Sequence, residues 1–277
     1  MSEQTTVSPC CITGHIHQGE PLGSFEILHG LRTYISNPKP PADGSKQNVV
    51  ILISDIFGVD LVNTKLVADE YAGRGWKVLL PDFFEGDAID HNLLNSIVPN
   101  LRVKAEATVA SKAVDTAKMA AAMGPWLAKH REAVSKPLIE KYVQAVRADP
   151  STGKIAAVGH CWGGRYSLIL AQDDSPARVD VAVGTHPSFL VNDDVKPITQ
   201  VPVAIFKGTE DDMMSDDALK EVEDILKGNL GDKLKVQLFD QAVHGFSVRG
   251  DLENDKERAQ KEEVTKATAD FIQKYFE

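Results

Sequence analysis

The chain has few cysteines, no long apolar run and less positive than negative charge. Three of its 277 residues are cysteine, and an odd number in a chain of this size does not indicate a disulfide framework. No apolar run approaches the ~18 residues that a membrane-spanning helix needs. The first residues contain no basic region followed by an apolar segment and are not rich in arginine, so we expect neither a secretory signal nor a transit peptide. These absences predict a cytoplasmic protein without a membrane partner.

The charge balance narrows the partners further. The chain has 30 Lys and Arg against 40 Asp and Glu, which gives a formal net charge of -10. An acidic protein repels the phosphates of nucleic acids and the heads of anionic lipids. We therefore expect a small-molecule substrate and no nucleic acid, with the chain acting as a monomer or a homodimer.

Two of the three cysteines are adjacent near the N-terminus. Cys10 and Cys11 are poorly placed to bridge each other, because a disulfide requires a specific separation of facing Cβ atoms. With His15 and His17 they form a C-C-x-x-x-H-x-H pattern, but structural zinc sites usually use C-x₂₋₄-C spacing. We predict no metal here, and interpret residues 1–24 as an arm packed on the domain.

Apolar segments of strand length alternate with segments of helical periodicity. Such alternation predicts an α/β fold with a mostly parallel sheet flanked by helices on both faces, in one domain of residues 1–277. A proline-rich loop, residues 37–47, separates two N-terminal strands. We expect residues from about 84 to 148 to be helical, with one part covering the sheet and the rest forming a small cap over the strand ends. The strands expected after the loop are 48–54, 76–82, 154–160, 179–186, 201–208 and 233–239, and the expected helices outside the helical segment are 61–75, 163–172, 215–228 and 253–276.

The third cysteine lies in a motif that carries chemistry. The stretch G-H-C-W-G places Cys161 between Gly159 and Gly163, where a G-x-S-x-G motif has its serine. A strand precedes the motif and a helix follows it, which is the context of a nucleophile turn. The start of that helix favours a thiolate through its dipole and free N–H groups. The alternative is a glycine-rich turn that only packs the helix on the strand.

A triad requires an acid and a histidine later in the chain, in that order. Asp211 follows a predicted strand in the pattern G-x-x-D, and its neighbour Asp212 is the competing acid. His244 lies in H-G-F after the last predicted strand, where the base belongs. The order nucleophile, acid and base favours a catalytic function for Cys161, Asp211 and His244.

Over nearly its whole length the chain resembles the eukaryotic branch of the dienelactone hydrolases. The resemblance rests on S-D-I-F-G-V-D, P-D-F-F-E-G-D, V-G-H-C-W-G-G, G-T-E-D-D-M and V-H-G-F. It implies a single α/β-hydrolase domain without a cofactor. It also implies a Cys-His-Asp triad, which in this sequence is Cys161, His244 and Asp211.

The segment S-D-I-F-G would supply part of an oxyanion hole. Two backbone N–H groups must face the oxygen of the tetrahedral intermediate, and we assign them to Trp162 and Ile56. The family has a glutamate before that isoleucine, which helps to switch the cysteine between thiol and thiolate. This chain has the shorter Asp55 instead. Asp55 serves either as that switch or as a structural acceptor for the turn.

The chain departs from the family in its expected substrate contacts. Bacterial members bind the dienelactone carboxylate with arginines near P-D and shortly after the histidine. Here P-D is followed by Phe83, Phe84 and Glu85, while Arg249 remains available for an anion. A more neutral or more aromatic ester or lactone is therefore plausible, and Trp162 is a further aromatic candidate for the pocket wall. The predicted pocket residues are Phe57, Phe84, His186, Phe246 and Arg249.

The cysteine itself indicates the class of substrate. A tetrahedral intermediate with an alkoxide leaving group tends to expel thiolate, whereas an enolate leaves readily. We therefore expect a hydrolase of activated esters or enol lactones that acts through a thioester. The alternatives are a thioesterase or acyltransferase, a non-catalytic ligand-binding protein, and a protein whose Cys161 senses oxidants.

Overall fold

The structure is a computed structural model, and it describes residues 14–36, 44–91 and 123–277. Several predictions fall partly outside these ranges. Cys10 and Cys11, the start of the predicted arm, most of the proline-rich loop and the middle of the predicted helical segment lie outside the described residues. The division of the chain into arm, domain and cap therefore stays a prediction.

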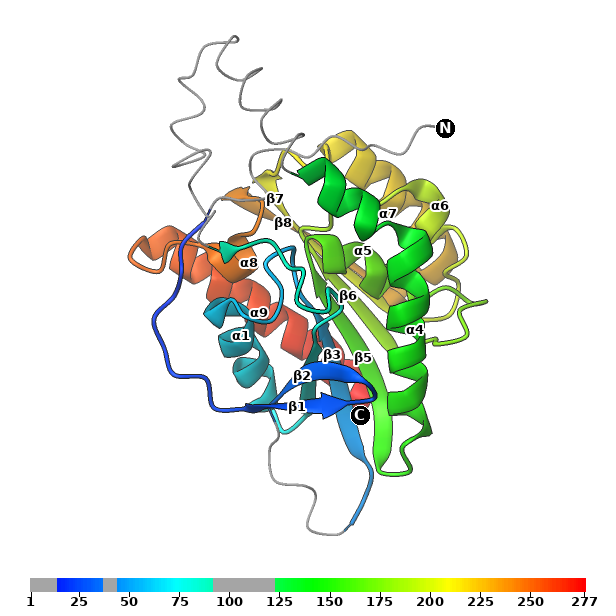
Figure 1. The fold of residues 1–277 in the computed structure, drawn as a ribbon. Helices are drawn as coiled ribbons and strands as arrows, with labels where there is room; N and C mark the ends of the chain where they lie inside the picture. The colour runs from blue at the N-terminus through cyan, green and yellow to red at the C-terminus, as the bar shows by residue number, and fades with distance from the viewer. Residues whose placement is uncertain (1–13, 37–43, 92–122) are drawn as a thin grey trace.

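The described residues form an eight-stranded sheet in the order β1-β2-β4-β3-β5-β6-β7-β8 (Figure 1). The first two strands pair antiparallel, and β2 also runs antiparallel to β4, while the remaining neighbours are parallel. The predicted α/β class with a mostly parallel sheet is confirmed. The strands are β1 (Ser24–Leu28), β2 (Leu31–Ser36), β3 (Gln47–Ile53), β4 (Lys77–Pro81), β5 (Thr152–His160), β6 (Val181–Thr185), β7 (Val203–Glu210) and β8 (Leu234–Val243).

The sheet separates two hydrophobic cores. Successive side chains of a strand point to opposite faces, so a strand buried on both faces is apolar throughout. In β3, Ile51 and Ile53 belong to one core and Val50 and Leu52 to the other. Figure 1 shows α4, α5 and α7 over one face and α1 and α9 over the other. The helices are α1 (Val62–Ala72), α4 (Glu132–Ala148), α5 (Trp162–Ile169), α6 (Asn192–Val195), α7 (Asp216–Leu230), α8 (Phe246–Arg249) and α9 (Asp255–Phe276).

Local sequence explains where several helices begin. Ser215 caps α7, as its hydroxyl oxygen accepts a hydrogen bond from the Ala218 N–H at 3.1 Å. Asn254 caps α9 in the same way. In the helical segment, residues 123–129 form a helix that ends before α4 begins at Glu132. The short α8 was not predicted, and β8 extends four residues beyond the predicted strand, so that it ends directly before His244.

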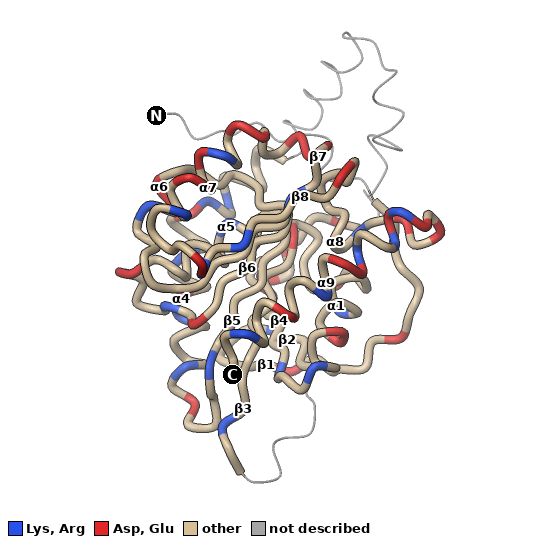
Figure 2. Tube along the Cα trace, turned by 180° about the vertical axis from the view of Figure 1, so that it is seen from behind, with Lys and Arg blue, Asp and Glu red and all other residues tan. Residues whose placement is uncertain are grey.

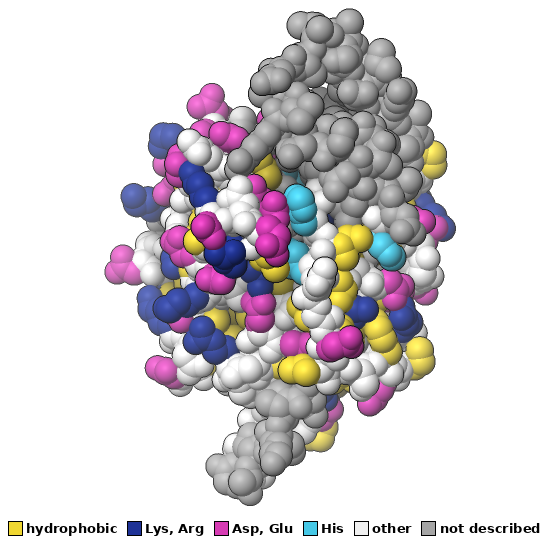
Figure 3. Space-filling model, turned by 90° about the vertical axis from the view of Figure 1, so that its left-hand side faces the viewer, with side chains coloured by type: hydrophobic (Ala, Val, Ile, Leu, Met, Phe, Trp, Pro, Cys, Tyr) yellow, Lys and Arg dark blue, Asp and Glu magenta, His cyan; other side chains and the backbone are white. Residues whose placement is uncertain are grey.

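The surface carries charges of both signs. Figure 2 shows acidic and basic residues interspersed along outer helices such as α7 and α9, without a basic stripe on either. On the face in Figure 3, hydrophobic side chains lie in small groups among charged ones. Within the described ranges, no helix combines the length and the apolar content that crossing a membrane requires.

Candidate active site

The nucleophile turn joins β5 to α5 with a backbone conformation that is rare for a residue with a side chain. Cys161 has φ 54° and ψ -115°, and its N–H donates a hydrogen bond to the Thr185 carbonyl at 3.1 Å. A Cβ atom on Gly159 would lie 2.0 Å from the Gly163 carbonyl oxygen, and one on Gly163 would lie 2.2 Å from the Ile53 carbonyl oxygen. The two glycines of the motif are therefore required for α5 to start this close to the sheet.

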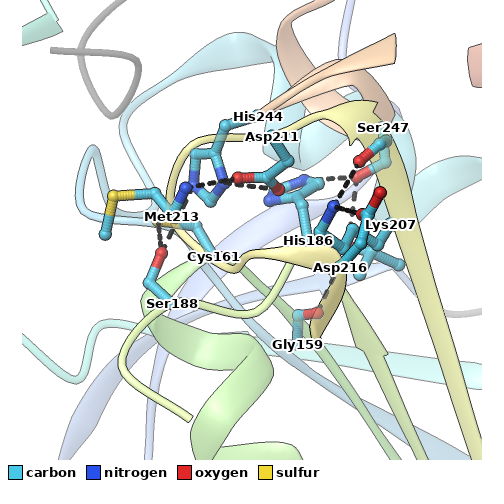
Figure 4. A network of polar contacts seen from close by, with 12 residues as sticks. Gly159, Cys161, His186, Ser188, Lys207, Asp211, Met213, Asp216, His244 and Ser247 are labelled. Carbon is cyan, nitrogen blue, oxygen red and sulfur yellow. Dashed lines mark hydrogen bonds and ion pairs between the residues drawn. The ribbon is translucent and has the colours of Figure 1, made fainter. Parts of the chain in front are cut away.

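The predicted acid and base, Asp211 and His244, follow β7 and β8 at the same edge of the sheet. Asp211 comes after β7 and His244 after β8, and both carboxylate oxygens of Asp211 lie 3.0 Å from His244 Nδ1 (Figure 4). Both side chains are fully buried. The Met213 N–H also donates to Asp211 Oδ1 at 2.8 Å, which holds the carboxylate in place. Asp212 is exposed, so the structure brings Asp211, of the two candidates, to the histidine.

A serine that the sequence interpretation missed lies between the nucleophile and the base. Ser188 Oγ is 3.3 Å from Cys161 Sγ and 3.4 Å from His244 Nε2. Figure 4 shows the three side chains grouped together with Asp211 beyond His244. Ser188 follows β6 in T-H-P-S-F. Its position directly after a central strand was a signal, but serine at a strand end is too common to single out.

The charges around His244 favour its protonated form. Burial lowers the pKa of His244, but attraction by Asp211 and Cys161 and hydrogen bonds to both outweigh it and hold that pKa well above its usual value. His244 thus interacts with Asp211 on one side and with Cys161 on the other. Such an arrangement supports an ion pair between thiolate and imidazolium.

Two further histidines lie behind the base and are neutral. Burial lowers the pKa of His160 to about 3, and burial followed by repulsion from His244 lowers that of His186 well below its usual value. His186 Nε2 and Ser247 Oγ are 2.7 Å apart, and the His186 ring centroid lies 4.8 Å from that of His244. His160 Nδ1 also contacts Ser247 Oγ, at 3.0 Å. These rings pack and support the base from the side of β5 and β6.

Asp55 and Arg249 form a buried ion pair beside this group. Arg249 Nε lies 3.1 Å from Asp55 Oδ2, without hydrogen-bond geometry, and neither side chain is exposed. The other oxygen of Asp55 accepts the Phe57 N–H at 3.0 Å, as expected of a structural acceptor. Burial raises the pKa of Asp55 to about 6, against the attraction of Arg249 and with repulsion from Cys161. The role of Asp55 as a thiol switch stays a prediction.

The two N–H groups predicted for the oxyanion hole come from two segments, one directly after Cys161 and one after β3. Trp162 is the first residue of α5, and the first N–H groups of a helix have no partner within it. Ile56 follows β3, in the turn in which Asp55 binds Phe57 and Gly58. Both residues are buried at the carboxyl edge of the sheet, and their part in catalysis stays a prediction.

A pocket opens beside Ser188. Its walls come from α5, from the loop after β6 and from the segment around the start of α4. Of its two arginines, Arg165 is paired with carboxylates, because Arg165 Nε lies 2.8 Å from Asp194 Oδ2 and Arg165 Nη2 lies 2.6 Å from Glu132 Oε2. Arg131 donates to the Ala128 carbonyl at 2.7 Å. The other walls are mainly aromatic and aliphatic. The lining residues are Leu127, His130, Arg131, Glu132, Trp162, Arg165, Tyr166, Ser188, Phe189 and Val191.

The predicted pocket residues lie elsewhere around the site. His186 and Phe246 are packed together behind His244, while Arg249 lies over Phe57, with its guanidinium carbon 5.1 Å from the ring centroid. Phe84 comes closest, since its ring centroid is 4.7 Å from that of Trp162, which does line the pocket. None of the five lines the pocket beside Ser188, so their contact with substrate stays a prediction.

No metal site was predicted, and within the described part of the chain no group of three or more His, Cys, Asp or Glu side chains is placed to hold a metal ion. His17 of the arm instead lies with its Nε2 at 2.8 Å from the Gly250 carbonyl oxygen. A zinc site that included His17 would also need Cys10 and Cys11, which lie outside the described residues.

Comparison with known proteins places this geometry in context. The family model described as "Dienelactone hydrolase family" matches residues 31–276. Hydrolase pyvD of Aspergillus violaceofuscus is 30% identical over 258 residues, which cover 92% of this chain and 91% of that protein. Dienlactone hydrolase 1 of Gibberella moniliformis is 28% identical, with 95% of this chain and 92% of that protein covered.

Solved structures agree on the fold. The crystal structure of a dienelactone hydrolase from Anabaena variabilis has a TM-score of 0.57 to this chain. The match covers 94% of this chain and 99% of the other at 14% sequence identity. At that identity the likeness supports the fold, and the chemistry has to be argued from the residues of this chain.

Proposed function

This chain belongs to the dienelactone hydrolase family and is a carboxylic ester hydrolase, and we propose that it cleaves activated esters or enol lactones with Cys161 as its nucleophile. The observation that carries the proposal is the buried line from Asp211 through His244 to Cys161. His244 Nδ1 lies 3.0 Å from Asp211, and a hydrogen bond to Cys161 contributes to its raised pKa.

In the first half of the reaction the Cys161 thiolate attacks the ester carbonyl carbon and forms a carbon–sulfur bond. The carbonyl oxygen becomes an oxyanion, for which the N–H groups of Trp162 and Ile56 are the proposed donors. The intermediate then collapses to a thioester and expels the enolate or aryloxide, which takes its proton from His244. Asp211 keeps the Nδ1–H of the imidazole oriented, so that Nε2 faces the reacting atoms.

In the second half His244, now neutral, takes a proton from a water molecule whose oxygen attacks the thioester carbonyl. The carbon–sulfur bond breaks, and its electron pair returns to Cys161 as a thiolate. His244 is again the imidazolium, so the ion pair of the resting enzyme is restored. The mechanism uses only side chains, backbone N–H groups and water, and no cofactor is proposed.

The charge of the pocket favours a neutral substrate. Arg165 is held by Asp194 and Glu132, and Arg249 is paired with Asp55. A substrate carboxylate would have to compete with Asp194 and Glu132 for Arg165 and with Asp55 for Arg249, and the pocket's second arginine, Arg131, is exposed and donates to the Ala128 carbonyl. The apolar walls suit an aromatic or enol group. We therefore propose neutral aryl or enol esters and lactones in preference to a carboxylated dienelactone.

The first test is hydrolysis of a neutral 4-nitrophenyl ester and of a dienelactone side by side, with Cys161→Ala as the control. We expect turnover of both by the wild-type protein, faster for the neutral ester, and none above background by the variant. Rapid cleavage of a simple ethyl ester would refute the argument from leaving groups. If neither substrate is cleaved while iodoacetamide modifies Cys161 rapidly, ester hydrolysis is the wrong reaction, and acyl transfer or redox sensing takes its place.

The proposal also covers the cellular location and the oligomeric state of the enzyme. We propose a small-molecule hydrolase of the cytoplasm, acting as a monomer or a homodimer. The net charge of -10 supports a small-molecule substrate over a nucleic acid. Fractionation of cells and sedimentation of the purified chain test the two statements.

A further inference from the structure

Ser188 occupies a position that the proposed reaction does not yet use. Its hydroxyl lies 3.3 Å from the nucleophilic sulfur and 3.4 Å from His244 Nε2, and its side chain is fully buried. A hydroxyl has one proton to donate and two lone pairs to accept with. Beside a thiolate, which only accepts, and an imidazolium, which only donates, one orientation of the hydroxyl satisfies both neighbours.

The backbone holds this hydroxyl in place independently of the side chain. The Ser188 N–H donates to the Cys161 carbonyl at 3.0 Å, and the His186 N–H donates to the Phe206 carbonyl at 2.6 Å. His186 and Phe189, on either side of Pro187 and Ser188, have φ of 37° and 59°. Such conformations are strained and persist where the surrounding structure enforces them, often at functional sites.

We propose that Ser188 is a catalytic residue of this site: its hydroxyl donates a hydrogen bond to the Cys161 sulfur whenever that sulfur carries negative charge. This proposal rests on the proposed function, in which the charge develops twice. The resting thiolate holds it before attack, and the sulfur regains it when the carbon–sulfur bond of the thioester breaks. Ser188 forms no covalent bond and its proton stays on the hydroxyl, while His244 Nε2 lies 3.4 Å from its Oγ.

Other charged groups around Cys161 also influence the ionisation of its thiol. His244 lies beside it after β8, Asp55 repels it from the turn after β3, and Arg249 of α8 pairs with Asp55. His186 behind His244 is neutral. A change at Ser188 leaves the contacts of Asp55 and Arg249 in place, and removes the hydroxyl's contacts with Cys161 and His244 together.

The test compares Ser188→Ala with Ser188→Thr, which keeps a hydroxyl, and with Ser167→Ala as a matched control. Ser167 is equally buried, but its hydroxyl bonds only the Gly164 and Val183 carbonyls. The first readout is the rate of alkylation of Cys161 by iodoacetamide against pH. A lost hydrogen bond to a charged group shifts the pH midpoint in Ser188→Ala upward by about one unit or more. Ser188→Thr should restore it, and Ser167→Ala should leave it unchanged.

The second readout is 4-nitrophenyl ester hydrolysis followed from the first turnover. In Ser188→Ala the release of thiolate from the thioester is slowed, so we expect a burst of nitrophenol and then a steady rate roughly tenfold lower, with KM changed less than kcat. Circular dichroism and thermal melting establish that each variant is folded.

The outcomes separate the two proposals. Alkylation needs no substrate, so the midpoint shift tests Ser188 even if no ester is hydrolysed, which would refute the proposed function alone. An unchanged midpoint in Ser188→Ala, or an equal shift in Ser167→Ala, overturns the role assigned to Ser188 even if ester hydrolysis proceeds.

Discussion

The buried pair of Asp55 and Arg249 should make the stability of an Arg249→Met variant depend on pH. At the observed 3.1 Å, two unit charges attract each other by about 5 kcal/mol at an effective dielectric constant of ~20. With Arg249 present, burial already raises the pKa of Asp55 to about 6. Without it that pKa rises by several further units, because one unit corresponds to about 1.4 kcal/mol. Asp55 then stays protonated in the folded variant throughout the neutral range.

The sign and size of the effect follow from proton linkage. A carboxyl group whose pKa is raised by folding contributes most to stability at low pH, and this contribution falls as pH rises toward the folded pKa. In the wild-type protein the fall ends near the Asp55 pKa of about 6. In Arg249→Met it continues at about 1.4 kcal/mol per pH unit. The variant should therefore lose about 3 kcal/mol more than the wild type between about pH 6 and pH 8, in addition to a constant loss of packing against Phe57.

Urea denaturation at about pH 6, 7 and 8, followed by tryptophan fluorescence, measures this difference. Arg147→Met is the matched control, because Arg147 pairs with Asp180 at 2.8 Å where both side chains are over a third exposed. Its difference from the wild type should not change with pH. Adding Asp55→Asn to Arg249→Met removes the titrating carboxyl group. The extra loss of unfolding free energy between about pH 6 and pH 8 that Arg249→Met shows should then disappear. A difference between Arg249→Met and wild type that is equal at all three pH values would refute the electrostatic coupling of the pair.

Four further substitutions have expected outcomes. Asp211→Asn should lower kcat for a 4-nitrophenyl ester by about 10⁴, because His244 loses the carboxylate that orients it. Asp212→Asn should keep kcat within about twofold of wild type, because Asp212 is exposed. Equal losses in the two variants would contradict the assignment of Asp211 as the acid. Gly163→Ala should yield little folded protein, since its Cβ would lie 2.2 Å from the Ile53 carbonyl oxygen, and soluble expression with circular dichroism checks this. Gly228→Ala in α7 meets nothing within 4 Å and should raise the free energy of unfolding by about 0.5–1 kcal/mol, measured by the same urea titration.

The sheet and the groups at its carboxyl edge were predictable because they depend on local patterns. Apolar runs such as 48–54 must be buried on both faces, and parallel strands bring the residues that follow them to one edge. That rule alone places Cys161, Asp211 and His244 near one another. It does not distinguish Asp211 from Asp212, because the side chains of adjacent loop residues point in different directions that the rule does not predict. Contacts such as the hydrogen bond from the Met213 N–H to Asp211 Oδ1 set these directions.

The pocket was not predictable in the same way, because it depends on which way side chains turn. Arg249 was predicted to line the pocket and to be available for an anion, and the four residues of α8 place it beside Asp55. A single helical turn is too short to show a periodicity. The predicted aromatic residues are of the same kind as the walls of the pocket beside Ser188, whereas Phe246 packs against Phe239 in the second core. Composition indicated an aromatic site, and packing decided which rings form it.

Ser188 shows why the remaining part required the structure. Nothing in T-H-P-S-F distinguishes this serine from the other serines of the chain. Its place depends on three contacts between segments far apart in sequence: its N–H on the Cys161 carbonyl, and its hydroxyl beside Cys161 Sγ and His244 Nε2. The neighbouring φ values of His186 and Phe189 further define the turn. A residue that takes its function from such contacts, and not from a motif, can be assigned only once the strands have been placed side by side.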